Sequence, residues 1–143
     1  MDMAETPTAD ILVVACDDRE LASTVSMLRS EGYTATGAGT FETARRLLKA
    51  PGGDRYDLMI TTLRLLPYNG LHLVIHNQTL HPTAKAIVLA GPSDTGSEME
   101  AERLGAHYVR TPVDPDRLLA LIRVVLEGRI ERTVRRWKTQ PTR

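Results

Sequence analysis

The chain alternates between short apolar runs and longer stretches in which apolar residues recur every three or four positions. The first run, Ile11-Leu12-Val13-Val14-Ala15, is continuous and rich in β-branched residues, which indicates a strand buried on both faces, as in a parallel sheet, and the run at 86–90 is a second buried strand of this kind. We expect strands at 11–15, 33–38, 57–63, 86–90 and 107–110. A helix is expected after each strand, the third over 71–80 and the fourth over 95–104. This alternation predicts an α/β fold with a five-stranded parallel sheet that is doubly wound, (βα)5.

Polar residues mark the expected helix starts. Asp17 and Asp18 offer carboxylates to the first helix, Thr40 is a predicted N-cap for the second, and Pro115 suits the first position of the last. A turn is indicated before the third helix by Asn69-Gly70. Three residues of that helix are expected to face inward, namely Leu71, Val74 and Ile75.

Composition places the chain among ordinary soluble proteins, with 42% apolar and 25% charged residues in a length of 143. The 18 basic and 18 acidic residues give a formal net charge of zero, which argues for neither a nucleic-acid nor a membrane partner. No apolar run approaches the roughly 20 residues of a membrane span. The first ten residues also lack the plan of a signal peptide. We therefore expect a cytoplasmic protein.

We expect a disordered lead over 1–9, one domain over 10–127, and a basic helical extension or tail over 128–143. From residue 127 to the end, six basic residues face two acidic ones. The lone Cys16 cannot form an internal disulfide. Because it ends an apolar run, it is expected to be a small buried hydrophobic residue.

Several short motifs in a fixed order carry a resemblance to a known family. They are Ile11-Leu12-Val13-Val14 before Asp17-Asp18, then Tyr56-Asp57-Leu58, Asn69-Gly70-Leu71, Gly105-Ala106 and Thr111-Pro112. In order and spacing the chain resembles the receiver domain of two-component response regulators, from about Ile11 to Leu126. The resemblance implies a flavodoxin-like sheet with strand order 2-1-3-4-5 and a role in phosphorelay signalling.

In that family a histidine kinase phosphorylates an aspartate that ends strand three. An acidic pair after strand one holds Mg²⁺, a Thr or Ser ends strand four, and a Lys precedes a cis-proline after strand five. Aligned on the motifs, the phosphoacceptor, the Thr or Ser and the Lys fall on Thr62, Ala90 and Thr111. The first lacks a carboxylate, the second a hydrogen-bond donor and the third a charge. The resemblance therefore implies a degenerate receiver, with a cis bond before Pro112 and Tyr108 at the position of the switch aromatic.

The acidic pair can be placed in three ways, because the first predicted strand is one residue longer than the family's usual run. The pair falls on Ala15 and Cys16, on Cys16 and Asp17, or in a shifted loop on Asp17 and Asp18. Even the last choice leaves Mg²⁺ without a carboxylate at Thr62, so weak or absent Mg²⁺ binding is expected, and no other metal or cofactor. Helix capping is favoured over a residual acidic pocket for Asp17 and Asp18.

One apolar stripe runs along the last predicted helix and beyond the compact domain. Its members are Leu119, Ile122, Leu126, Ile130, Val134 and Trp137. The helix carries more apolar residues than one buried face hides, so these six are expected to form an interface. The implied partner is another protein or a second copy, docked on the face formed by helix four, strand five and helix five.

The leading hypothesis is a non-enzymatic pseudo-receiver, a phosphorylation-independent interaction or dimerisation module in signal transduction. One alternative is a phosphorelay receiver phosphorylated at a non-standard carboxylate, although Asp57 begins strand three and lies at its far end. Another is a regulator whose basic tail contacts nucleic acid, which the shortness of the tail disfavours. An enzyme on the same scaffold has no support, because paired carboxylates, a nucleophile elbow and a phosphate loop are all missing from the sequence.

Overall fold

The computed structural model describes residues 9–51, 56–65, 68–92, 94 and 96–139, with side chains described as far as Glu127. Its main sheet holds five parallel strands in the order β2-β1-β3-β6-β7. Their bounds are β1 (Asp10–Val14), β2 (Thr34–Ala38), β3 (Leu58–Thr62), β6 (Lys85–Ala90) and β7 (His107–Arg110). Two further short strands, β4 (Arg64–Leu65) and β5 (Tyr68–Asn69), pair antiparallel directly after β3. Apart from that pair, the order is the predicted 2-1-3-4-5, so the predicted sheet is confirmed.

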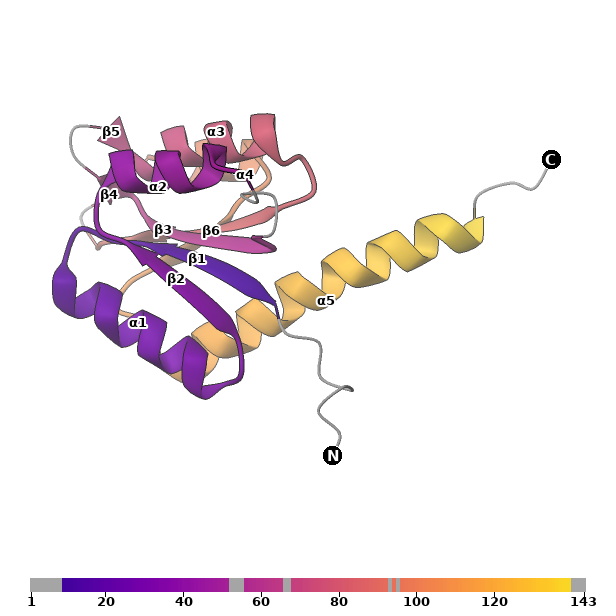
Figure 1. Ribbon diagram of the computed structural model, residues 1–143, viewed down its shortest axis with the longest axis horizontal. Helices are drawn as coiled ribbons and strands as arrows, with labels where there is room; N and C mark the ends of the chain where they lie inside the picture. The colour runs from indigo at the N-terminus through magenta and orange to yellow at the C-terminus, as the bar shows by residue number, and fades with distance from the viewer. Residues whose placement is uncertain (1–8, 52–55, 66–67, 93, 95, 140–143) are drawn as a thin grey trace.

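Helices cover both faces of the sheet (Figure 1). They are α1 (Asp18–Ser30), α2 (Phe41–Lys49), α3 (Gly70–Leu80), α4 (Glu98–Arg103) and α5 (Pro115–Thr139). Figure 1 shows α2, α3 and α4 on one face and α1 and α5 on the other. The predicted doubly wound α/β fold is therefore confirmed.

Each central strand feeds two separate cores, because successive strand side chains point to opposite faces of a sheet. Ile11 packs with Leu28 of α1 and Ile122 of α5, whereas the next residue, Leu12, packs with Leu73 of α3. All five of these side chains, from Ile11 to Ile122, are fully buried. A strand covered on both faces needs an apolar residue at every position, which explains the continuous apolar runs in the sequence.

Three of the predicted helix starts are formed as expected, at Asp17, at Thr40 and at Pro115, where α5 begins, and the start of the fourth helix is not. Asp17 caps α1 by accepting a hydrogen bond from the backbone N–H of Glu20, and Thr40 caps α2 in the same way. The fourth helix was expected from position 95, yet α4 begins at Glu98. Gly96 lies in the left-handed region at φ 88°, a conformation that cannot continue into a right-handed helix.

The Asn69-Gly70 pair is the start of α3 and not the predicted turn. The Asn69 side chain accepts hydrogen bonds from the N–H groups of Leu71 and His72, and the His72 ring accepts one in return from the Asn69 N–H. Ile75 is a second correction, since it is 46% exposed and not inward-facing. The buried stripe of α3 runs instead through Leu71, Leu73, Val74 and Asn77.

The apolar stripe of the last helix belongs largely to the domain's own core. Leu119, Ile122 and Leu126 are 7%, 0% and 9% exposed and pack against the strands and α1. The interface predicted for these three residues is therefore wrong. The sheet face between α1 and α5 is broad enough to bury them, and of the large apolar residues between 118 and 126 only Val124 is strongly exposed, at 61%. The other members, Ile130, Val134 and Trp137, lie outside the described side chains.

Both predicted tails adjoin regular structure. The expected lead falls outside the described residues over 1–8, while the carbonyl of Ala9 accepts a hydrogen bond from the Thr34 N–H at 3.0 Å. At the other end, α5 continues without a break from the domain to Thr139 and projects past the sheet (Figure 1). In the part of the chain that the structure describes, no helix combines the length and apolar character that a membrane crossing requires.

Candidate functional site

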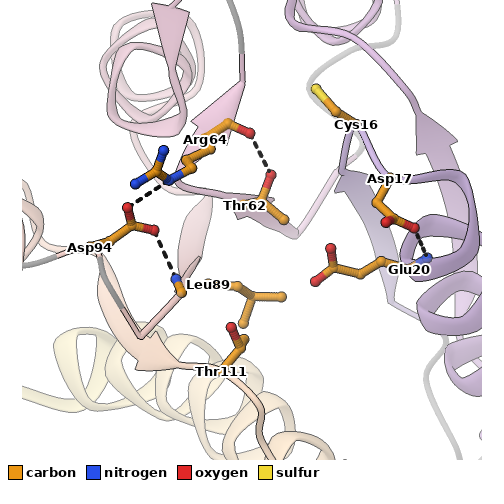
Figure 2. A pocket seen from close by; sticks show the side chains of 9 residues that line it. Cys16, Asp17, Glu20, Thr62, Arg64, Leu89, Asp94 and Thr111 are labelled. Atoms are coloured by element: carbon orange, nitrogen blue, oxygen red, sulfur yellow. Dashed lines mark hydrogen bonds and ion pairs between the residues drawn. The ribbon is translucent and has the colours of Figure 1, made fainter.

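A cleft of about 280 Å³ opens at the carboxyl ends of the central strands (Figure 2). Side chains from the ends of β3 and β6, from the start of α1 and from the segments that follow β1, β3, β6 and β7 surround it. The lining residues are Cys16, Asp17, Glu20, Thr62, Arg64, Leu89, Gly91, Asp94 and Thr111. In open parallel sheets this edge is where ligands and chemistry gather.

Thr62 is the last residue of β3, which is the position the sequence predicts for it. Its register is fixed by parallel pairing with Leu89 of β6. The Thr62 hydroxyl is half-buried and donates a hydrogen bond to the carbonyl of Arg64 at 3.2 Å. The cleft therefore contains the Thr62 hydroxyl, which is hydrogen-bonded to the segment that directly follows β3.

Gly70 allows the chain to pass close behind Thr62. Its N–H donates to the Leu63 carbonyl at 2.7 Å, which brings the start of α3 against the end of β3. A Cβ at Gly70 would lie only 2.3 Å from the Thr62 carbonyl oxygen, a distance that a side chain cannot adopt. Glycine is thus required here for close backbone approach.

The loop after β1 places one acidic residue in the cleft. Ala15 is buried and its N–H donates to the Ala38 carbonyl, so it continues the sheet edge for one residue. Cys16 and Asp17 line the cleft, whereas Asp18 is exposed and is not among the lining residues. Asp17 accepts the Glu20 N–H at 2.9 Å, so the capping role favoured for it is confirmed. Cys16 is exposed because β1 ends at Val14, two residues before it. The prediction of a buried cysteine is therefore wrong.

Glu20 is a cleft residue that the sequence analysis missed. It lies in the first turn of α1, and Figure 2 shows its carboxylate directed into the cleft. Burial raises the pKa of Glu20 above its ordinary value, and the negative charge of Asp17 raises it further. The spacing from Asp17 to Glu20 resembles a capping box, a pattern that would have placed the Glu20 carboxylate back on the helix start.

Asp94 is the second missed residue, and it is held on both carboxylate oxygens. One oxygen accepts a hydrogen bond from Arg64 Nε at 2.7 Å, and the other accepts the Gly91 N–H at 2.9 Å (Figure 2). The side chain of Asp94 is only 8% exposed, against 72% for Arg64. The two partners are thirty positions apart in sequence, and no local pattern links them.

The remaining predicted positions lie on β6 and β7. Ala90 ends β6 and is fully buried, and its carbonyl accepts hydrogen bonds from both the N–H and the hydroxyl of Thr111, at 2.8 and 3.2 Å. The Thr111–Pro112 peptide bond is cis, in agreement with the expectation. Tyr108 is half-buried against the α2–α3 core, and its hydroxyl donates to the carbonyl of Asp94 at 3.0 Å.

The cleft therefore combines three carboxylates, one guanidinium and two hydroxyls. Among the described residues, no three His, Cys, Asp or Glu side chains come together in a way that could hold a metal ion. Asp17 and Glu20 lie together at the start of α1, Asp94 lies on the β6–α4 connection, and the carboxylates of Asp17 and Asp94 already accept backbone or guanidinium hydrogen bonds.

Comparison with known proteins places this arrangement in a family, although no family model matches the chain. The transcriptional regulatory protein GlrR of Escherichia coli is 28% identical over 129 residues, which are 89% of this chain and 28% of that protein. The DNA-binding transcriptional regulator NtrC of Proteus hauseri is 32% identical over 83 residues, which are 57% of this chain and 18% of that protein. The chain thus spans less than a third of the length of these curated relatives.

Two solved receiver structures match over almost their whole length. A response regulator receiver protein from Pseudomonas putida is 30% identical, with 82% of this chain and 98% of that chain covered and a TM-score of 0.73. A CheY-like receiver domain protein from Methanospirillum hungatei is 26% identical, with 88% and 99% covered and a TM-score of 0.78. With the sheet order and the position of the cleft, these matches establish that the chain belongs to the response regulator receiver domains.

Proposed function

We propose that this receiver domain signals without accepting a phosphoryl group at the end of β3, and that it acts by binding another protein. The observation that carries the proposal is Thr62. It occupies the strand end where the family resemblance places the aspartate nucleophile. A hydroxyl cannot form the acyl phosphate that a carboxylate forms, so the family reaction has no acceptor at this position.

The rival is phosphorylation of another carboxylate in the cleft. Asp94 is disfavoured because both of its oxygens already accept hydrogen bonds and its side chain is buried. Asp17 is committed to capping α1. Glu20 is the remaining candidate, since within the described residues its carboxylate accepts no hydrogen bond. Asp57 directly precedes β3, about 17 Å from Thr62 at about 3.3 Å per residue.

Incubation with acetyl phosphate and Mg²⁺, followed by intact-mass measurement, tests the proposal. We expect no gain in mass for the wild-type chain. A hydroxylamine-labile gain of one phosphoryl group would overturn the proposal. Loss of that gain in Glu20→Gln or Asp17→Asn would identify the acceptor. A typical receiver domain treated in parallel serves as the positive control for the donor.

The partner surface proposed here is the face formed by α4, β7 and α5. It carries the exposed charged residues Glu98, Glu102 and Arg117 beside Tyr108. Met99 is 69% exposed on α4, which adds an apolar contact to this surface. We propose that a second copy or a constitutive protein partner docks there, with the projecting end of α5 extending the contact.

Sedimentation at matched concentrations tests this assembly. Removing the residues after Glu127, or changing Trp137→Ala, is expected to weaken self-association by about 1–2 kcal/mol, because Trp is enriched among interface hot spots. Monomeric behaviour of both the full chain and the truncation, with Trp137 fluorescing as a solvated indole, would contradict the proposal.

A second candidate role is suggested by the relatives, which are named as transcriptional regulators. The excess of basic residues over 128–143 favours a nucleic-acid contact by that segment. Such binding would be electrostatic, so its affinity would fall steeply as salt is raised. Equal affinity of the full chain and of a chain ending at Glu127 for duplex DNA at low salt would eliminate this role.

A further inference from the structure

Three separate segments meet at Asp94, two of which, with their contacts to its carboxylate, are seen in Figure 2. Arg64, from the segment after β3, donates to one carboxylate oxygen, and the Gly91 N–H, at the end of β6, donates to the other. The Tyr108 hydroxyl, from the edge strand β7, donates to the backbone carbonyl of the same residue. Asp94, in the β6–α4 connection, thus contacts residues that follow the central strands β3 and β6 and a residue of the edge strand β7.

The Arg64–Asp94 pair differs in its burial from the other ion pairs between described residues. Its Nε–Oδ1 distance is 2.7 Å and the Asp94 side chain is 8% exposed. By comparison, the Arg110–Glu98 pair nearby has a distance of 3.6 Å and side chains 57% and 50% exposed. Exposed pairs contribute little because water and salt screen them, whereas a short charge-assisted hydrogen bond on a buried carboxylate holds its geometry.

The contacts continue back to β3 as well. The Thr62 hydroxyl donates to the Arg64 carbonyl, which fixes the backbone that carries the guanidinium. A continuous series of contacts therefore runs from Thr62 through Arg64 and Asp94 to Tyr108. Burial raises the pKa of Tyr108, and Asp94 and Glu98 raise it further against the opposing effect of Arg110, so its hydroxyl stays protonated and able to donate.

We propose that Arg64 and Asp94 form a built-in clamp that holds the β6–α4 connection and Tyr108 in one arrangement without a phosphoryl group. The clamp fixes the Tyr108 ring against the α2–α3 core and with it the surface that α4 and β7 present to a partner. The inference rests on the proposed function in one respect: the surface of α4 and β7 is taken to bind its partner without phosphorylation. Arg64 and Asp94 are positioning residues in this scheme and bind no substrate themselves.

Solution NMR of the full chain with labelled tyrosine tests the clamp, with the Tyr108 ring signals assigned through Tyr108→Phe. We expect Arg64→Gln and Asp94→Asn to shift these signals and to speed amide exchange at Gly91 by about five- to tenfold, because each removes the charge-assisted hydrogen bond. Arg64→Lys keeps the positive charge and is expected to retain part of the protection. Arg123→Gln is the control, since it breaks an exposed pair with Glu31 that does not involve Tyr108 and should leave the Tyr108 signals in place.

Unchanged Tyr108 signals and Gly91 exchange in Arg64→Gln would overturn the clamp. Because Arg64 is largely exposed, that variant is expected to fold, and Asp94→Asn, which preserves side-chain size, gives an independent reading. The acetyl phosphate assay is run on the same samples. Phosphoryl uptake by the wild-type chain would remove the proposed function, whereas the Tyr108 signals would still decide separately whether the clamp exists.

Discussion

The interior of the sheet and the cleft at its carboxyl edge are built from the same strands, yet apolar packing holds the interior and polar contacts hold the cleft. In the interior, Leu12 and Ile60 are fully buried among apolar neighbours on opposite faces. At the edge, Thr62, Arg64 and Asp94 bond to one another. The receiver fold therefore depends on the interior, and the polar residues at the edge can vary while the strands stay in register. A TM-score of 0.78 at 26% identity is consistent with that separation.

The largest effect that we predict lies in the interior. Ile122→Ala in α5 removes a side chain that is fully buried between the sheet and α1. We expect a loss of about 2–5 kcal/mol in the free energy of unfolding, measured by urea denaturation. Val124→Ala on the same helix is the matched control, because Val124 is 61% exposed, and a change within about 0.5 kcal/mol is expected there. Similar losses at the two positions would mean that α5 does not dock as described.

The second effect lies at the boundary between interior and cleft. Gly70→Ala places a Cβ against the Thr62 carbonyl, so α3 must shift away from β3. We expect destabilisation by about 1–3 kcal/mol, as for other overpacked positions. Thermal unfolding followed by circular dichroism measures it.

Gly39→Ala is the control for that change, because a Cβ there meets nothing within 4 Å and the residue is not in the left-handed region. Its expected effect is neutral or slightly stabilising, through lower entropy of the unfolded chain. Destabilisation of equal size at both glycines would contradict the close approach behind Thr62.

The same division explains which features the sequence could predict. The strands lie within about a residue of their predicted bounds, because burial on both faces leaves an uninterrupted apolar signal. The position of Thr62 at the end of β3 follows from the family resemblance, counted from Tyr56-Asp57 and from Asn69-Gly70. The cis bond before Pro112 followed from the family resemblance.

The cleft contacts could not be predicted in this way. Arg64 and Asp94 are joined across thirty positions, and neither stands in a periodic pattern. Glu20 occupies a capping-box position but faces the cleft, a choice decided by tertiary surroundings. Cys16 follows an apolar run, and only the end of β1 at Val14 determines that it is exposed. Helical periodicity failed for Leu119 and Leu126 because it cannot tell a domain's own core from a partner's surface.

The smallest effect that we predict concerns charge in the cleft. The pKa of Glu20 is raised from 4.5, chiefly by burial and then by Asp17, so ionising this carboxyl is harder in the folded chain than in the unfolded one. The folded state therefore binds the proton more tightly, and stability falls as pH rises through the raised pKa. Glu20→Gln removes the free-energy cost of ionising this partly buried carboxyl beside Asp17. It is expected to stabilise the domain at pH 7 by less than about 1 kcal/mol, since Glu20 is partly solvated.

The gain should disappear below pH 4.5, where Glu20 is protonated in both states and behaves like glutamine. Urea denaturation at pH 7 and pH 4 measures the difference. Glu42→Gln is the opposite control, because its hydrogen bond to Arg45 lowers the pKa of Glu42, so the ionised form is the favoured one and its removal is expected to destabilise at pH 7. If Glu20→Gln were as stabilising at pH 4 as at pH 7, the effect would come from packing, and the Glu20 carboxylate would not carry the charge penalty that its position in the cleft implies.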